Sequence, residues 1–192
     1  LMYIPEADED RDIRAKLAAI EHYGAILHRC APTIAAREAL CAQVQAYTGA
    51  TSVHPYTDPR FIAGQGTAAL ELLTAHPDLD ALVVPLGGGG LAAGTALAMR
   101  ALAPDCQLYL AEPEGAADGA RSFAKGALDH DFVPDTICDG LRGTLGAINF
   151  DILRAAGARV LTVDDAQVVG AMRLRWTRTK QLVEPSSATA LA

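Results

Sequence analysis

Apolar residues recur along the chain in two periods, one typical of helices and the other of buried strands. Near the start, apolar positions three and four residues apart predict a helix over residues 8–23 that ends at Gly24. A second helix is predicted up to residue 47, with Thr33 as its N-cap. Short apolar runs predict strands at residues 1–5, at residues 25–30 and around Val53. These elements follow one another in a β-α-β-α-β rhythm.

Both periods break at residues 54–67, where proline, glycine and aspartate accumulate. We expect this segment to connect two parts of the chain, and we place the domain boundary near His54, between residues 1–53 and residues 54–192. Thr67 is expected to cap the helix that runs from it to Thr74. His54 is a single titratable residue beside a proline, for which we expect a structural role.

Beyond the boundary, short apolar runs alternate with segments of helical period. The predicted elements are a strand at 81–86, a helix at 91–102, a strand at 107–112, a short helix at 121–126, a helix at 150–155, a strand at 159–163 and a helix at 164–182. The apolar positions of the last helix are Val168, Met172, Leu174 and Trp176. This alternation predicts an α/β fold in which a parallel sheet is covered by helices on both faces.

Four consecutive glycines, Gly87, Gly88, Gly89 and Gly90, stand where a predicted strand passes into a predicted helix. Without Cβ atoms, the backbone N–H groups of such a loop can approach a phosphate closely, and the following helix N-terminus adds positive potential. The loop therefore predicts a bound phosphate ester. The alternative is a glycine turn that serves only the tight packing of strand and helix.

Spacing alone leaves the identity of the phosphate open. Residues 88–93 also fit the G-x-G-x-x-A dinucleotide pattern, and Glu112 ends the next predicted strand, where a carboxylate that binds ribose is expected. A Rossmann domain that binds NAD through Gly88, Gly90 and Glu112 is therefore an alternative. A P-loop is excluded, because no Gly-Lys-Ser/Thr follows the glycines.

Composition narrows the classes of function. The 192 residues are 51% hydrophobic and carry a net charge of −7 spread along the chain, which argues against disorder and against nucleic-acid binding. The uncharged stretch 81–99 is broken by Pro85 and the glycines, so no membrane span is predicted, and residues 1–5 lack the features of a secretion signal. Four widely spaced cysteines predict small buried side chains in a reducing cytoplasm.

Five segments together resemble one family of enzymes. They are HPYTDPRFIAGQGTAALELL, ALVVPLGGGGLAAGTALAMRALAP, YLAEPEGAAD, TICDGLRGTLG and LVEPSSATALA, in this order. The chain is similar in them to the serine/threonine dehydratase and serine racemase family, pyridoxal-phosphate enzymes of the tryptophan synthase β fold (fold type II). The resemblance covers essentially the whole chain.

The resemblance implies a fold of three-layer lobes with parallel sheets, incomplete here at both ends. Residues 1–53 correspond to part of the small lobe and residues 54–192 to most of the large lobe, which binds the cofactor phosphate. It further implies that Gly87–Gly90 and the amide of Leu91 hold the 5′-phosphate of pyridoxal phosphate, and that Gly140 and Glu184 line the cofactor cleft, with Glu184 near the pyridine ring.

The resemblance also implies a divalent cation. In the branch of the family that contains the racemases, a carboxylate, a backbone carbonyl four residues later and a second carboxylate six residues from the first hold a metal ion. The matching positions here are Glu112, Ala116 and Asp118. Oxygen ligands of this kind suit Mg²⁺, Ca²⁺ or Mn²⁺. The alternative is an acid at the end of a strand and a solvated acid in a loop.

The chemistry implied by the resemblance requires a lysine that forms a Schiff base with the cofactor. The chain contains Lys16, Lys125 and Lys180 only, none of them in the Ser-x-Lys setting of the family. We therefore expect a truncated chain without catalytic activity. The parent enzyme is expected to deaminate L-serine or L-threonine to a 2-oxo acid and ammonia, or to racemise serine. Its partners are a small hydroxy amino acid and further copies of itself, as a homodimer or homotetramer.

Overall fold

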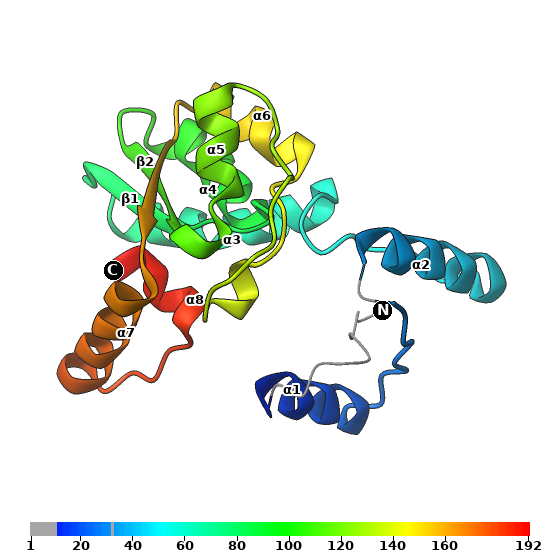
Figure 1. The fold of residues 1–192 in the computed structure, drawn as a ribbon. Helices are drawn as coiled ribbons and strands as arrows, with labels where there is room; N and C mark the ends of the chain where they lie inside the picture. The colour runs from blue at the N-terminus through cyan, green and yellow to red at the C-terminus, as the bar shows by residue number, and fades with distance from the viewer. Residues whose placement is uncertain (1–10, 32) are drawn as a thin grey trace. The chain divides into compact units, whose positions relative to one another are not determined.

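Residues Leu1–Val53 and His54–Ala192 form separate units in the computed structural model, which describes residues 11–31 and 33–192 (Figure 1). The expected strand at residues 1–5 lies outside the described residues. None of the helices in the described part of the chain is long and apolar enough to cross a bilayer.

The described residues of the first unit form helices α1 (Arg11–His22) and α2 (Ile34–Thr48), which confirms both expected helices. Thr33 is the N-cap of α2, because its side chain accepts a hydrogen bond from the Ala36 amide at 3.1 Å. The strands expected at residues 25–30 and around Val53 are not present. A strand persists only where a neighbour pairs its backbone groups, and the described residues of this unit contain no strand to do so.

The second unit alternates helices and strands. Its elements are α3 (Pro59–Ala75), β1 (Ala81–Pro85), α4 (Gly90–Leu102), β2 (Gln107–Pro113), α5 (Asp118–Lys125), α6 (Ala147–Ala155), β3 (Arg159–Val163), α7 (Asp165–Leu174) and α8 (Pro185–Ala188). Short 3-10 turns lie at Glu114–Ala116, Asp139–Leu141 and Thr189–Leu191. The expected α/β fold with a parallel sheet is confirmed.

Helix α3 begins eight positions before the cap that the sequence predicts at Thr67, so that prediction is wrong. Asp58 is the N-cap and accepts a hydrogen bond from the Arg60 amide at 2.8 Å, while Pro59 occupies the first helical position, where its missing N–H costs nothing. Hydrogen bonds from Arg60 lower the pKa of Asp58 to about 2. Thr67 lies within the helix, and its hydroxyl donates to the Gly64 carbonyl at 2.7 Å.

The three strands are parallel and lie in the order β1-β2-β3. Since this order advances in one direction and parallel crossovers are right-handed, α4 and α6 fall on the same face of the sheet. The main core lies there, between strand residues such as Leu110 and the helices α3, α4 and α6. The opposite face is only partly covered, because Val83 is 39% and Leu161 is 49% exposed. The expectation that residues 81–86 form a fully buried strand is wrong, because Ala81 and Val83 are exposed.

The last long helix is shorter than the pattern 164–182 predicts. After α7 the chain continues as one π-helical turn, Arg175–Thr179, and ends it at Lys180 with a φ of 59°. Val168 is fully buried and Met172 packs beside it, whereas Leu174 is 49% and Trp176 is 62% exposed. Only the first two apolar positions therefore serve the core. In Figure 1, α7 lies beside α8 near the C-terminus.

Helices α3 and α4 approach most closely where two glycines face each other. A Cβ on Gly94 would lie 2.4 Å from the Ile62 carbonyl oxygen, and one on Gly66 would lie 2.8 Å from the Gly94 carbonyl oxygen. Real side chains do not tolerate such distances to a backbone atom. This contact sets the spacing of the two helices, and the glycine loop leads directly into one of them.

We expect Gly94→Ala to lower the free energy of unfolding by about 2–3 kcal/mol, because the methyl group forces α3 and α4 apart. Gly64→Ala is the matched control: a Cβ there meets nothing within 4 Å, and alanine should raise the stability by about 0.5–1 kcal/mol. Urea unfolding followed by circular dichroism measures both. Equal effects of the two substitutions would contradict the close contact.

Candidate functional site

The glycine loop connects the end of β1 to the start of α4. The Leu86 amide still donates to the Ala111 carbonyl at 2.8 Å, so the loop leaves the sheet only after this residue. Gly89 has a φ of 89°, in the region that favours glycine. A Cβ on Gly89 would lie 2.7 Å from Leu145 Cδ1, and one on Gly88 would lie 2.4 Å from Tyr56 Cγ. The loop is therefore packed so closely that larger residues do not fit.

The backbone N–H groups of residues 87–92 find no hydrogen-bond acceptor in the described part of the chain. Among the residues that the structure describes, no side chain caps α4, a helix of 13 residues whose N-cap is Gly89. Gly87, Gly89 and Gly90 are nevertheless buried, and buried donors are almost always paired. An anion bound at the loop would pair them and would also meet the positive end of α4.

The structure brings Gly140 and Glu184 to the same place as the loop. A Cβ on Gly87 would lie 3.5 Å from the Gly140 carbonyl oxygen, and a Cβ on Gly140 would lie 3.6 Å from Glu184 Oε1. The hydroxyl of Ser186, in α8, accepts a hydrogen bond from the Gly140 amide at 3.0 Å. The predicted phosphate-binding residues and the predicted ring-binding residues thus form one continuous group.

Two residues of this group are absent from the sequence predictions. The Tyr56 ring stands against the Cα atom of Gly88, and the Asn149 side chain donates to the carbonyl oxygens of both Tyr56 and Gly88. Asn149 is 93 positions away from Tyr56 and carries no local motif, so only the folded chain brings them together.

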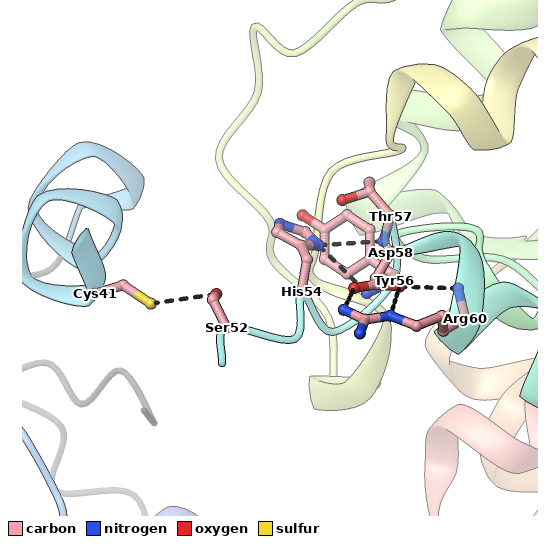
Figure 2. A network of polar contacts seen from close by, with 7 residues as sticks. All are labelled: Cys41, Ser52, His54, Tyr56, Thr57, Asp58 and Arg60. Atoms are coloured by element: carbon pink, nitrogen blue, oxygen red, sulfur yellow. Dashed lines mark hydrogen bonds and ion pairs between the residues drawn. The ribbon is translucent and has the colours of Figure 1, made fainter. Parts of the chain in front are cut away.

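His54 has the structural role that the sequence predicts. Its Nδ1 atom accepts hydrogen bonds from the Thr57 amide at 3.1 Å and from the Tyr56 amide at 3.4 Å, and its ring meets the Tyr56 ring edge-on (Figure 2). These contacts fold the segment before α3 into a tight turn that positions Tyr56 against the loop. Figure 2 also shows the Asp58–Arg60 pair that begins α3.

Glu112, near the end of β2, and Asp118, at the start of α5, are both fully buried. Glu112 accepts hydrogen bonds from the Gly119 amide at 2.9 Å and the Ala120 amide at 2.8 Å, so it caps α5. Asp118 Oδ2 accepts from the Leu145 amide at 2.8 Å, whereas its Oδ1 atom has no partner in the described residues. Neither acid is solvated.

Burial, and to a lesser extent the charge of Asp118, raises the pKa of Glu112 to about 7, although the two backbone hydrogen bonds oppose this. Burial likewise raises the pKa of Asp118. Because Glu112 faces the α5 amides inside the protein, it is not positioned to bind the ribose of a dinucleotide. The geometry therefore argues against the NAD alternative.

The fit of a metal ion to these acids rests on the unpaired Asp118 Oδ1 atom. Each Glu112 oxygen accepts one hydrogen bond and retains a further lone pair. Ala116 is also fully buried. Within residues 11–31 and 33–192, no group of three or more His, Cys, Asp or Glu side chains could hold a metal, so a site here would depend on the backbone carbonyl of Ala116.

The lysines lie in other settings. Lys125, at the end of α5, is paired at 3.9 Å with Asp129, and Lys180 donates to the Thr177 carbonyl at 2.8 Å beyond the π-helical turn. Lys16 is an exposed residue of α1 in the first unit.

Cys138 is buried as expected, but the other three cysteines are only half-buried, and all four are free thiols.

A parallel α/β unit with an open row of loop amides at the start of a helix defines the class of proteins that bind a phosphate group at the carboxyl ends of the strands. The sequence model of one family, described as "Pyridoxal-phosphate dependent enzyme", matches residues 2–192. The chain belongs to this family, and the expected resemblance is confirmed.

Individual relatives agree with this assignment. The chain is 43% identical over 179 residues to a beta-hydroxyaspartate dehydratase of Paracoccus denitrificans, covering 93% of this chain and 57% of the relative. It is 41% identical to a serine racemase of Dictyostelium discoideum, covering 92% of this chain and 55% of the relative. The solved structure of maize serine racemase matches with a TM-score of 0.89 and 38% identity, over 99% of this chain and 59% of the other. The chain thus spans somewhat over half the length of these relatives.

We expect Gly89→Ala to weaken the binding of inorganic phosphate by about tenfold or more, because alanine disfavours the backbone conformation and its Cβ collides with Leu145. Gly170→Ala on α7 is the matched control, since a Cβ there meets nothing within 4 Å. Isothermal titration calorimetry gives the affinity of each variant. The same affinity in both would show that the phosphate binds elsewhere.

Proposed function

We propose that this chain forms the part of a pyridoxal-phosphate enzyme that holds the cofactor's phosphate. The backbone amides of Gly87, Gly88, Gly89, Gly90 and Leu91 bind the 5′-phosphate. The main supporting observation is that these donors, three of them in buried glycines, lack acceptors in the described chain. The loop needs glycine at these positions, because a Cβ at Gly88 would collide with Tyr56 and one at Gly89 with Leu145.

Gly140 and Glu184 would line the ring of the cofactor. The proximity of these residues supports this assignment. Gly87 lies close to the Gly140 carbonyl oxygen, and Gly140 lies close to the Glu184 carboxylate. Glu184 is exposed in this chain and stands at the N-terminus of α8, where its carboxylate can accept a proton or a hydrogen bond. In this proposal it influences the protonation of the pyridine ring.

The parent enzyme acts on a small hydroxy amino acid. It either eliminates the β-hydroxyl of serine, threonine or 3-hydroxyaspartate, giving a 2-oxo acid and ammonia, or racemises serine. The names of the relatives, a dehydratase and serine racemases, support both reactions. When bound, the cofactor supplies an electron sink that stabilises negative charge at Cα. The residues of this chain contribute binding and orientation of the cofactor.

Catalysis needs a lysine to link the cofactor covalently and to move the Cα proton. Lys125 and Lys180 have other partners, and Lys16 belongs to α1. We therefore propose that the 192-residue chain binds the cofactor without a covalent link and does not catalyse the reaction itself. The parent enzyme works as a homodimer or homotetramer in the cytoplasm, and the four free thiols are consistent with this compartment.

Titration of the chain with pyridoxine 5′-phosphate tests the function, because this ligand carries the phosphate but no aldehyde that would react with surface lysines. We expect saturable binding in calorimetry, with pyridoxine binding at least about tenfold more weakly and NADH binding weakly or not at all. Pyridoxal 5′-phosphate should leave no single lysine stoichiometrically modified after borohydride reduction. Tighter binding of NADH would favour the dinucleotide alternative and refute the proposal.

We also propose a divalent cation, Mg²⁺, Ca²⁺ or Mn²⁺, held by Glu112, Asp118 and the carbonyl of Ala116. The supporting observation is the buried Asp118 Oδ1 atom without a partner in the described chain, for which a cation is a natural ligand. None of the three residues belongs to the glycine loop, and Asp118 begins α5, so the ion would stabilise the fold rather than take part in the chemistry.

We expect Mn²⁺ to raise the melting temperature of the chain by about 3 °C or more, because the ion binds the folded state alone. Asp118→Asn should abolish this rise, whereas Asp151→Asn, an exposed acid on α6, should retain it. Differential scanning fluorimetry with and without the ion measures the three proteins. A rise that persists in Asp118→Asn, or none in the unmodified chain, would remove the metal site from the proposal.

A further inference from the structure

Asn149 is a fully buried residue of α6 whose side-chain amide contacts two distant backbone segments. Its Nδ2 atom donates hydrogen bonds to the Tyr56 carbonyl oxygen at 2.8 Å and to the Gly88 carbonyl oxygen at 2.6 Å. Because both partners are acceptors only, the nitrogen and not the oxygen must face them. A single side chain thus ties α6 to the turn before α3 and to the glycine loop.

The bond to Gly88 fixes the direction of the next amide. The Gly88 carbonyl oxygen also accepts a hydrogen bond from the Gly146 amide at 3.1 Å, so both of its donors come from the start of α6. In a trans peptide the C=O and N–H bonds point in opposite directions, and no cis peptide occurs among the described residues. With its carbonyl held toward α6, the peptide must direct the Gly89 N–H away from α6.

The hydrogen bond to the Tyr56 carbonyl holds in place the turn that carries the Tyr56 ring. The Tyr56 carbonyl is held by Asn149 while the amides of Tyr56 and Thr57 are held by His54, so the turn is bound at both ends. The Tyr56 ring then stands against the Cα atom of Gly88, where a Cβ would lie 2.4 Å from Cγ. Asn149 therefore also sets the separation between this ring and the loop.

The remaining polar atom of Asn149 indicates that the two donated bonds are the reason for an amide here. Its Oδ1 atom is buried and has no partner in the described chain, which costs desolvation energy that an apolar side chain of similar size would avoid. An apolar side chain would instead leave the two carbonyl oxygens without this donor. The Gly88 peptide could then turn its oxygen toward the anion.

We propose that Asn149 is a positioning residue for the phosphate of the cofactor. By holding the carbonyl oxygens of Gly88 and Tyr56, it keeps the Gly89 N–H directed at the phosphate and keeps the loop open beside Tyr56. This inference rests on the proposed function, because it assumes that a phosphate is bound at residues 87–91. It goes beyond that function because it assigns a role to Asn149, whose side-chain N–H groups are already donated to two backbone carbonyl oxygens.

The test compares the affinities of the unmodified chain, Asn149→Leu, Asn149→Thr and Ser122→Ala for pyridoxine 5′-phosphate and for pyridoxine. Leucine removes both donated bonds while keeping the same branched arrangement of side-chain heavy atoms, and threonine retains one hydroxyl donor. Ser122→Ala is the control, because it also removes a buried side-chain bond to backbone, from the Asp129 amide at 2.9 Å, but does so on α5. Urea unfolding of each variant measures stability separately.

We expect Asn149→Leu to weaken binding of the phosphate-bearing ligand by about tenfold or more while binding of pyridoxine changes little, and Asn149→Thr to recover part of the loss. Ser122→Ala should lower stability without changing the ratio of the two affinities. Equal loss for both ligands, or no loss, would overturn the positioning role. If the unmodified chain binds neither ligand, the proposed function fails, which is a separate result.

If Asn149→Leu does not fold, the amide NMR spectrum of the unmodified chain tests the direction of the Gly89 N–H instead. On addition of inorganic phosphate, the Gly89 amide proton should move downfield by more than that of Leu91, since its direction is set by the hydrogen bonds to the Gly88 carbonyl. A Gly89 resonance that does not move while other loop amides do would overturn the proposal.

Discussion

The backbone amides of residues 87–92, which have no acceptor in the described part of the chain, are the constraint on which the rest of this unit depends. Buried donors without acceptors destabilise a fold, and they remain tolerable only where a ligand completes them. Three features surround these amides. The glycines allow close packing of neighbouring side chains, the pairing of β1 ends at Leu86, and α4 begins without a side-chain cap in the described chain. In our proposal, the arrangement that costs stability in the free chain provides binding energy for a phosphate.

Support for the loop comes from contacts between segments that are distant in sequence. Gly66 and Gly94 let α3 and α4 meet backbone to backbone, and α6 holds the Gly88 carbonyl through Gly146 and Asn149. In the proposed complex, the direction of the loop amides is therefore set by residues that do not contact the phosphate. This is a division between groups that bind and groups that orient, as rigid binding sites generally require.

Much of this was predictable from local patterns, because those patterns report local physics. The glycine run, the Thr33 cap and the alternation after residue 80 each follow from backbone geometry within a few positions. The strand expected at residues 25–30 could not be judged correctly from local sequence, since a strand depends on a pairing partner. The cap expected at Thr67 was wrong because Asp58 and Pro59 start the helix earlier. Tyr56 and Asn149 could not be predicted at all, because their contacts exist only in the folded chain.

A crystal structure of the chain grown with pyridoxal phosphate would show whether the loop amides bind the phosphate of that cofactor. We expect phosphate density within hydrogen-bond distance of the N–H groups of residues 87–91, with the Gly88 carbonyl still turned toward Asn149. Phosphate density at another place, or a loop that meets the phosphate with its carbonyl oxygens, would contradict this expectation.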